Sequence, residues 1–172
     1  NDLLVVILDR PRHEELIAEI RRAGARIKLI IDGDVAGALM AAMPGTGIDA
    51  LFGIGGAPEA VVAACALKCI GGDMQCRLWP RNDEERRIAQ EKGINLHRKH
   101  SIEDLVAGDN VFFSATGITD GELLRGVRFY GSGASTQSLV MRSRSGTVRR
   151  IDAEHKLWKL RQIGAPQYLS HL

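Results

Sequence analysis

One order of elements occurs three times in the first part of the chain: a short apolar run, a turn rich in charge or glycine, and a segment with helical periodicity. The apolar runs cover residues 3–8, 26–31 and 51–54, and the helical patterns that follow them cover residues 13–23, 35–43 and 59–67. Continuous apolar runs are typical of strands buried on both faces, and helices supply the crossovers that parallel strands require. The alternation therefore predicts an α/β fold with a mainly parallel sheet and flanking helices.

Polar or glycine residues follow each of the three expected strands. In a parallel sheet with right-handed crossovers, the carboxyl ends of the strands meet at one edge, where ligands bind. Guanidinium groups suit phosphate, and paired carboxylates accept hydrogen bonds from sugar hydroxyls, so this set indicates a phosphorylated polyol. The alternative is that the aspartates cap helices and the arginines lie in solvent. In chain order the residues are Arg10, Arg12, Asp32, Asp34, Gly55, Gly56 and Glu59.

The third of these turns brings two glycines and a carboxylate to the start of a helix. Gly55 and Gly56 lack a Cβ atom, so a bound group can approach the backbone, and Pro58 suits a first helical turn. Glu59 has two interpretations: a metal ligand, or a residue that complements the helix dipole in a connecting turn. A nicotinamide-dependent enzyme is a distant third hypothesis, because Pro58 stands where the dinucleotide fingerprint requires its third glycine.

The later part of the chain predicts a different arrangement. A fourth apolar run covers residues 74–79, and a fifth strand is expected over residues 111–116. Helices are expected to begin at Asn82 or Asp83, and at a capping box over residues 101–104. Runs between glycine turns predict antiparallel strands that continue one edge of the sheet. These runs cover residues 127–130, 135–141 and 147–153.

Length and charge limit the class of protein. At 172 residues the chain fits a single domain, residues 1–172, with a core of its own. A net charge of +2 and 5% aromatic residues disfavour nucleic-acid binding. No apolar run reaches the ~20 residues of a membrane span. The basic stretch over residues 142–150 has two interpretations, a contact with an anion or a hairpin with a solvated face, and the hairpin is expected.

Cysteine and histidine give no sign of a metal centre. The three cysteines form no C-x-x-C pair, and two lie in an apolar helical segment, so we expect reduced core residues of a cytoplasmic protein. The five histidines are scattered through charged or terminal segments and are expected at the surface. The cysteines are Cys65, Cys69 and Cys76, and the histidines are His13, His97, His100, His155 and His171.

Five motifs, in this order, closely resemble the class II (GlpX-type) fructose-1,6-bisphosphatases, and the match runs along nearly the whole chain. They are Asp9-Arg10-Pro11-Arg12-His13, Asp32-Gly33-Asp34-Val35-Ala36, Gly53-Ile54-Gly55-Gly56-Ala57-Pro58-Glu59, Phe113-Ser114-Ala115-Thr116-Gly117-Ile118-Thr119 and Thr147-Val148-Arg149-Arg150-Ile151. The resemblance implies a cytoplasmic, Mg²⁺- or Mn²⁺-dependent enzyme of gluconeogenesis that removes the 1-phosphate of fructose 1,6-bisphosphate. Some relatives also use sedoheptulose 1,7-bisphosphate.

The same resemblance implies roles for residues of the three turns, while it assigns no catalytic residue to this chain. Arg10 and Arg12, joined by Pro11, would hold substrate phosphate; Asp32, Gly33 and Asp34 would bind the sugar; Gly56 would contact substrate through its backbone; and Glu59 would ligate the catalytic metal.

The chain resembles only the C-terminal, substrate-binding half of the family, the second half of a sugar-phosphatase-like fold. The family's first half supplies most of the metal-binding carboxylates, and one glutamate is too few for metal-assisted hydrolysis. The expected partners are therefore fructose 1,6-bisphosphate, the missing N-terminal half of the same enzyme and, in a homo-oligomer, further copies. This chain alone would be inactive. The alternative is a non-catalytic module that binds a phosphosugar or a partner chain.

Overall fold

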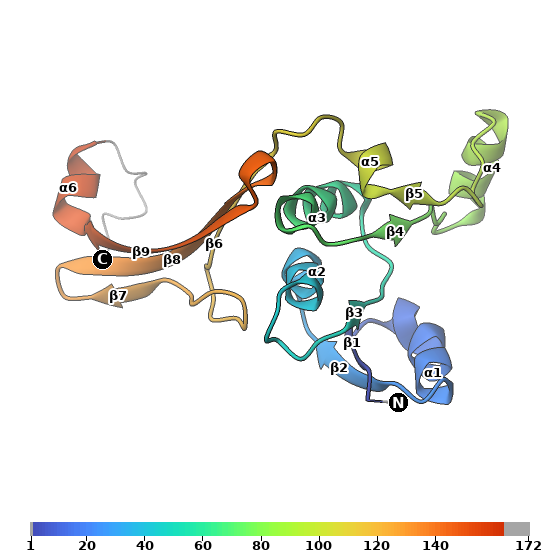
Figure 1. The fold of residues 1–172 in the computed structure, drawn as a ribbon, viewed down its shortest axis with the longest axis horizontal. Helices are drawn as coiled ribbons and strands as arrows, with labels where there is room; N and C mark the ends of the chain where they lie inside the picture. Colours follow the sequence, from blue (N-terminus) through green and yellow to red (C-terminus); the bar gives the residue numbers. More distant parts are fainter. Residues whose placement is uncertain (1, 164–172) are drawn as a thin grey trace.

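The first three strands form a parallel sheet in the order β2-β1-β3, which confirms the predicted α/β alternation (Figure 1). The computed structural model describes residues 2–163. β1 (Leu4–Leu8) is the middle strand and pairs along its full length with β2 (Arg26–Ile30). On its other side β1 pairs with β3 (Ala50–Leu51). All residues of β1 after Leu4 are buried, as expected for a strand covered on both faces.

Helices cover both faces of the parallel sheet. On one face lies α1 (Glu14–Arg22), which follows the one-turn helix η1 (Pro11–His13). On the other lies α2 (Asp34–Ala42), against which α3 (Ala57–Ile70) packs. Alternate side chains of β1 point to opposite faces, so its apolar residues reach both layers. Val5 and Ile7 cluster with Ile17 and Ile20 of α1, whereas Val6 clusters with Met40 of α2.

The strand predicted over residues 51–54 is wrong in extent, because β3 ends at Leu51 and Phe52 is exposed. The Phe52 N–H still donates to the carbonyl of Val6, at 3.1 Å. In a regular parallel ladder the next bond would join the Ile54 N–H to the carbonyl of Leu8. The side chain of His13 bonds to both of these groups instead, so the ladder stops there.

The fourth apolar run does not join the parallel sheet. Within residues 74–79 only β4 (Gln75–Cys76) is a strand, and it pairs antiparallel with β5 (His100–Ser101). The side chains of Leu78 and Trp79 are exposed. The run therefore lacks the burial on both faces that holds a central parallel strand in place.

Both predicted helix starts are confirmed. α4 (Asp83–Glu91) begins after Asn82, whose side chain accepts a hydrogen bond from a first-turn N–H at 2.8 Å. α5 (Ile102–Leu105) begins after Ser101, which forms a capping box with Asp104. In each case a local pattern of polar side chains satisfies N–H groups that the helix itself leaves without partners.

The C-terminal strands form a separate antiparallel sheet, so the prediction that they continue the parallel sheet is wrong. The long strand β8 pairs with β9 along one edge and with β6 and then β7 along the other. The positions predicted for the strands are confirmed, and β8 and β9 form the predicted hairpin around residues 142–150. The elements are β6 (Phe112–Thr116), β7 (Arg128–Tyr130), β8 (Gly133–Arg142), η2 (Ser143–Ser145), β9 (Thr147–Lys156) and α6 (Leu157–Gln162).

One apolar cluster joins the antiparallel sheet to the helices. Leu139 and Met141 of β8 and Phe113 of β6 pack against Leu39 of α2 and Ala66 of α3. One face of the antiparallel sheet is apolar and must be covered by other apolar side chains. Helices α2 and α3 provide this cover. Beyond this contact the sheet extends away from the helices (Figure 1).

The cysteines are free thiols, and Cys69 is buried in the cluster that joins the two sheets. Burial, with a further contribution from Cys65, raises the pKa of the Cys69 thiol, which makes it a poor nucleophile. Cys65 and Cys76 are half-buried. Among the helices of residues 2–163, none has the length and apolar character needed to span a bilayer.

The joining cluster predicts a large effect at Leu39. Leu39 is fully buried, so Leu39→Ala leaves a cavity and should lower the free energy of unfolding by about 2–5 kcal/mol. Ile31→Ala is the control, because this side chain is 80% exposed and its loss should cost less than about 0.5 kcal/mol. Urea denaturation followed by circular dichroism measures both, and equal midpoints would contradict the place of Leu39 in the core.

Candidate functional site

Three turns at the carboxyl edge of the parallel sheet lie together, as the sequence predicts. The first turn is residues 9–12 after β1, the second is residues 31–33 after β2, and the third is residues 52–56 after β3. Arg12 Nε donates to the carbonyl oxygen of Ile54 at 2.7 Å, which joins the first turn to the third. Asp34 begins α2 and lies against Gly55, where an added Cβ atom would be 2.7 Å from Asp34 Oδ2.

His13 is a buried residue that also ties the first turn to the third, so the prediction of a surface histidine is wrong here. Its side chain is 0% exposed. His13 Nε2 accepts a hydrogen bond from the Ile54 N–H at 2.8 Å, and Nδ1 therefore carries the proton and donates to the Leu8 carbonyl at 2.8 Å. The signal that could have revealed this residue is its position, directly after the arginine pair that closes β1.

The first turn keeps donors available on both arginines. Pro11 begins η1, where its fixed φ suits a helix start. Arg10 Nη1 donates to the carbonyl of Asp9 at 3.1 Å, while Arg12 is exposed and uses Nε on Ile54. Within residues 2–163, no hydrogen bond engages the two terminal nitrogens of Arg12. The turn can therefore receive an anion without breaking the contact with Ile54.

Asp32 of the second turn and Asp34 at the start of α2 have different surroundings. Asp32 Oδ1 accepts a hydrogen bond from the adjacent Gly33 N–H at 2.9 Å, but α2 has no side-chain cap, so the alternative that Asp32 caps a helix is wrong. Gly33 has a φ of 95°, in the left-handed region that favours glycine. Asp34 is half-buried, and its carboxylate makes no hydrogen bond or ion pair within the described part of the chain. Asp34 is thus the aspartate that faces the third turn.

In the third turn the carboxylate of Glu59 folds back over Gly56. Gly56 is the N-cap of α3, and Glu59 lies in the first turn of that helix. An added Cβ atom at Gly56 would be 2.1 Å from Glu59 Oε2, so this position of the carboxylate requires a glycine. The carboxylate complements the helix dipole, and it also places exposed oxygen atoms at the strand edge.

Asp34 and Glu59 flank the adjacent glycines Gly55 and Gly56 with carboxylate oxygens, the ligand type that Mg²⁺ and Mn²⁺ prefer. Across residues 2–163 no group of three or more His, Cys, Asp or Glu side chains is placed to hold a metal ion. Because such ions take about six ligands, these two carboxylates are not by themselves a complete metal site.

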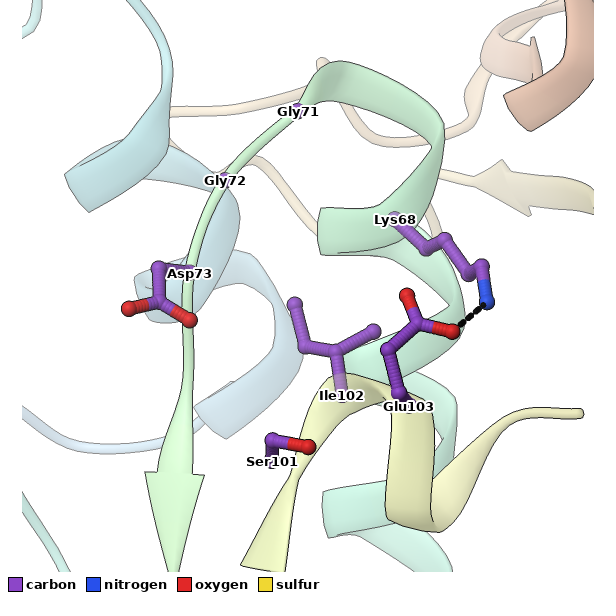
Figure 2. A pocket seen from close by; sticks show the side chains of 7 residues that line it. All are labelled: Lys68, Gly71, Gly72, Asp73, Ser101, Ile102 and Glu103. Carbon is purple, nitrogen blue, oxygen red and sulfur yellow. Dashed lines mark hydrogen bonds and ion pairs between the residues drawn. The ribbon is translucent and has the colours of Figure 1, made fainter. Parts of the chain in front are cut away.

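A pocket of about 240 Å³ lies at the other end of α3, away from the three turns (Figure 2). Lys68 and Glu103 form an ion pair of 2.7 Å in its wall, and Lys68 also donates to the Val106 carbonyl at 3.0 Å. Asp73 accepts from the Met74 N–H at 2.8 Å. Since these charged side chains already bond to groups of the protein, the strand edge is the better candidate site.

A family model described as bacterial fructose-1,6-bisphosphatase, glpX-encoded, matches residues 1–155. The chain belongs to this family. A D-fructose 1,6-bisphosphatase class 2/sedoheptulose 1,7-bisphosphatase from Synechococcus sp. (strain JA-2-3B'a(2-13)) is 51% identical over 168 residues, which cover 90% of this chain and 48% of the relative. A fructose-1,6-bisphosphatase class 2 from Haemophilus influenzae is 43% identical over 176 residues, 95% of this chain and 53% of the relative.

The resemblance based on the five motifs is therefore confirmed. This member of the GlpX-type family spans about half the length of the two relatives. The three turns of its parallel sheet lie within the matched residues, and so do all the residues for which the sequence predicts a substrate or metal role.

The fold of Glu59 over Gly56 predicts what a methyl group would do there. Gly56 has φ −71° and ψ 151°, which alanine also adopts, so Gly56→Ala should cost no more than about 1 kcal/mol of unfolding free energy while displacing the Glu59 carboxylate. Gly131→Ala is the control, because a Cβ atom there meets nothing within 4 Å. Urea denaturation and a crystal structure of each variant test this, and an unmoved Glu59 would contradict it.

Proposed function

We propose that the polypeptide containing this chain hydrolyses the 1-phosphate of fructose 1,6-bisphosphate, and that this chain supplies the substrate-binding half of the site. The observation that carries the proposal is the contact among the three turns, which brings guanidinium groups, carboxylates and an open glycine backbone to one strand edge. The names of the two relatives support this substrate class, and the Synechococcus relative adds sedoheptulose 1,7-bisphosphate.

In this proposal the first turn binds phosphate and the second binds sugar. The contact of Nε with Ile54 orients the guanidinium plane of Arg12, and its terminal nitrogens can donate side by side to two phosphate oxygens. Asp32 and Asp34 accept hydrogen bonds from sugar hydroxyls. Gly56, which has no Cβ atom, lets the substrate approach the backbone at the start of α3.

Glu59 is the proposed ligand of Mg²⁺ or Mn²⁺ in this chain. A bound divalent ion neutralises charge on the transferring phosphoryl group and lowers the pKa of the attacking water. In the overall reaction the water oxygen adds to phosphorus, the bond from phosphorus to the sugar O1 breaks, a proton from the water passes to O1 to give the sugar hydroxyl, and inorganic phosphate is released. Because residues 2–163 hold no set of three ligands, the N-terminal half of the enzyme would supply the others.

The cellular setting follows the same proposal. Free thiols at Cys65, Cys69 and Cys76 fit the reducing cytoplasm, where gluconeogenic bisphosphatases work. A homo-oligomer is the expected assembly of the complete enzyme.

A second hypothesis is a non-catalytic module that binds a phosphosugar or a partner chain. It is favoured by the incomplete set of metal ligands within the described residues. An assay of the complete protein with Mg²⁺ or Mn²⁺ separates the two hypotheses. Release of inorganic phosphate from fructose 1,6-bisphosphate or its seven-carbon analogue supports the enzyme, and saturable binding without release supports the module.

Glu59→Gln tests the metal role. The amide keeps the shape of the side chain but loses the charge, so in the complete enzyme we expect the metal concentration for half-maximal rate to rise by about tenfold or more, with a lower kcat. Glu19→Gln is the matched control, because Glu19 is exposed on α1. Titration of the phosphate-release rate with Mn²⁺ measures the effect. An unchanged metal requirement would leave Glu59 with only its dipole role.

Arg12→Ala tests the phosphate role. Loss of a charged hydrogen bond to substrate should raise KM by about 10- to 100-fold, with little change in the metal requirement. The KM of Arg12→Lys should lie between those of the wild type and Arg12→Ala, because lysine keeps the positive charge but lacks the planar guanidinium group. Arg22→Ala, at an exposed position of α1, is the control. Steady-state kinetics decide the matter, and a wild-type KM in Arg12→Ala would exclude the assigned contact.

A further inference from the structure

The imidazole of His13 occupies the place of a ladder bond between β1 and the chain after β3. The last direct bond of the ladder joins the Phe52 N–H to the Val6 carbonyl. The Ile54 N–H and the Leu8 carbonyl lie two residues further along the two chains. His13 Nε2 accepts from the first of these groups and Nδ1 donates to the second, each at 2.8 Å. The ring thus replaces one direct bond with two and adds its own width between the two chains.

We propose that His13 is a positioning residue, whose hydrogen bond to the Ile54 N–H holds the third turn beside the first so that Arg12 and Gly56 reach the same substrate. The inference rests on the proposed function. Directly paired strands lie about 4.8 Å apart, which leaves no room between their backbones for a group bound at the strand ends. An inserted ring opens this edge while the Leu8 carbonyl and the Ile54 N–H keep hydrogen-bond partners.

The third turn has few other attachments. Within residues 2–163, no backbone N–H of residues 53–56 donates to another backbone carbonyl. The turn is held by His13 at the Ile54 N–H and by Arg12 at the Ile54 carbonyl, which also lies 3.2 Å from His13 Nε2. Arg12 is exposed, whereas His13 is buried. The buried bond therefore contributes more to the placement of the turn, since water competes less for its groups.

Two amide substitutions each remove one of the two hydrogen bonds of the His13 side chain and keep the other. The side-chain nitrogen of asparagine can take the place of Nδ1, so His13→Asn keeps the bond to Leu8 and loses the one to Ile54. The longer glutamine can place an oxygen near the position of Nε2, so His13→Gln keeps the bond to Ile54 and loses the one to Leu8. His100→Asn, at a half-buried histidine of β5, is the control for loss of an imidazole elsewhere.

The complete enzyme with each substitution is assayed for its KM toward fructose 1,6-bisphosphate and for amide hydrogen exchange of residues 53–56 by mass spectrometry. We expect His13→Asn to raise both KM and the exchange rate by about tenfold, because the Ile54 N–H loses its partner. His13→Gln and His100→Asn should change each by less than about threefold.

Equal effects of the two His13 variants would overturn the proposal, and so would a lower melting temperature with unchanged KM and exchange in His13→Asn. If His13→Asn does not fold, His13→Gln decides: KM and exchange near wild type support the proposal, and a tenfold rise in either overturns it. Absence of phosphate release by the wild-type enzyme would instead refute the proposed function, and hydrogen exchange would still test whether His13 places the turn.

Discussion

The hydrogen bonds of the buried His13 ring are the interaction on which the strand-edge site depends. They connect the Leu8 carbonyl at the end of β1 to the Ile54 N–H beyond β3. Both backbone groups would otherwise lack partners at the point where the two chains separate, and an unpaired buried backbone group is costly. The ring satisfies them in one neutral tautomer. The third turn can therefore leave the sheet early and still occupy a defined position.

The rest of the fold supports this edge without entering it. Helices α1 and α2 bury the two faces of β1, which fixes the strand whose end carries the arginine pair. The cluster around Leu39 and Leu139 then joins α2 and α3 to the antiparallel sheet. α2, which begins with Asp34, and α3, whose first turn carries Glu59, are thus anchored by apolar packing, while their first turns lie at the strand edge.

Two carboxylates at the strand edge have no partner in the described part of the chain. Asp34 and Glu59 carry carboxylates with no bonding partner among residues 2–163, and both lie against glycines that leave room for them. In the proposed function, substrate hydroxyls, a cation and donors from outside this chain would satisfy them.

The sequence by itself determined the α/β class, the positions of most helices and strands, the caps at Asn82 and Ser101, and the polar residues at the strand ends. These features depend on local periodicity and on side chains within a few residues of one another. Only the tertiary structure decided that β4 pairs with β5, that the C-terminal strands form their own sheet, and that His13 is buried between residues 5 and 41 positions away in the chain. The residue pattern of a strand does not specify which strand it pairs with. A histidine in a charged segment is buried only when backbone groups brought together by the fold bond to both of its ring nitrogens.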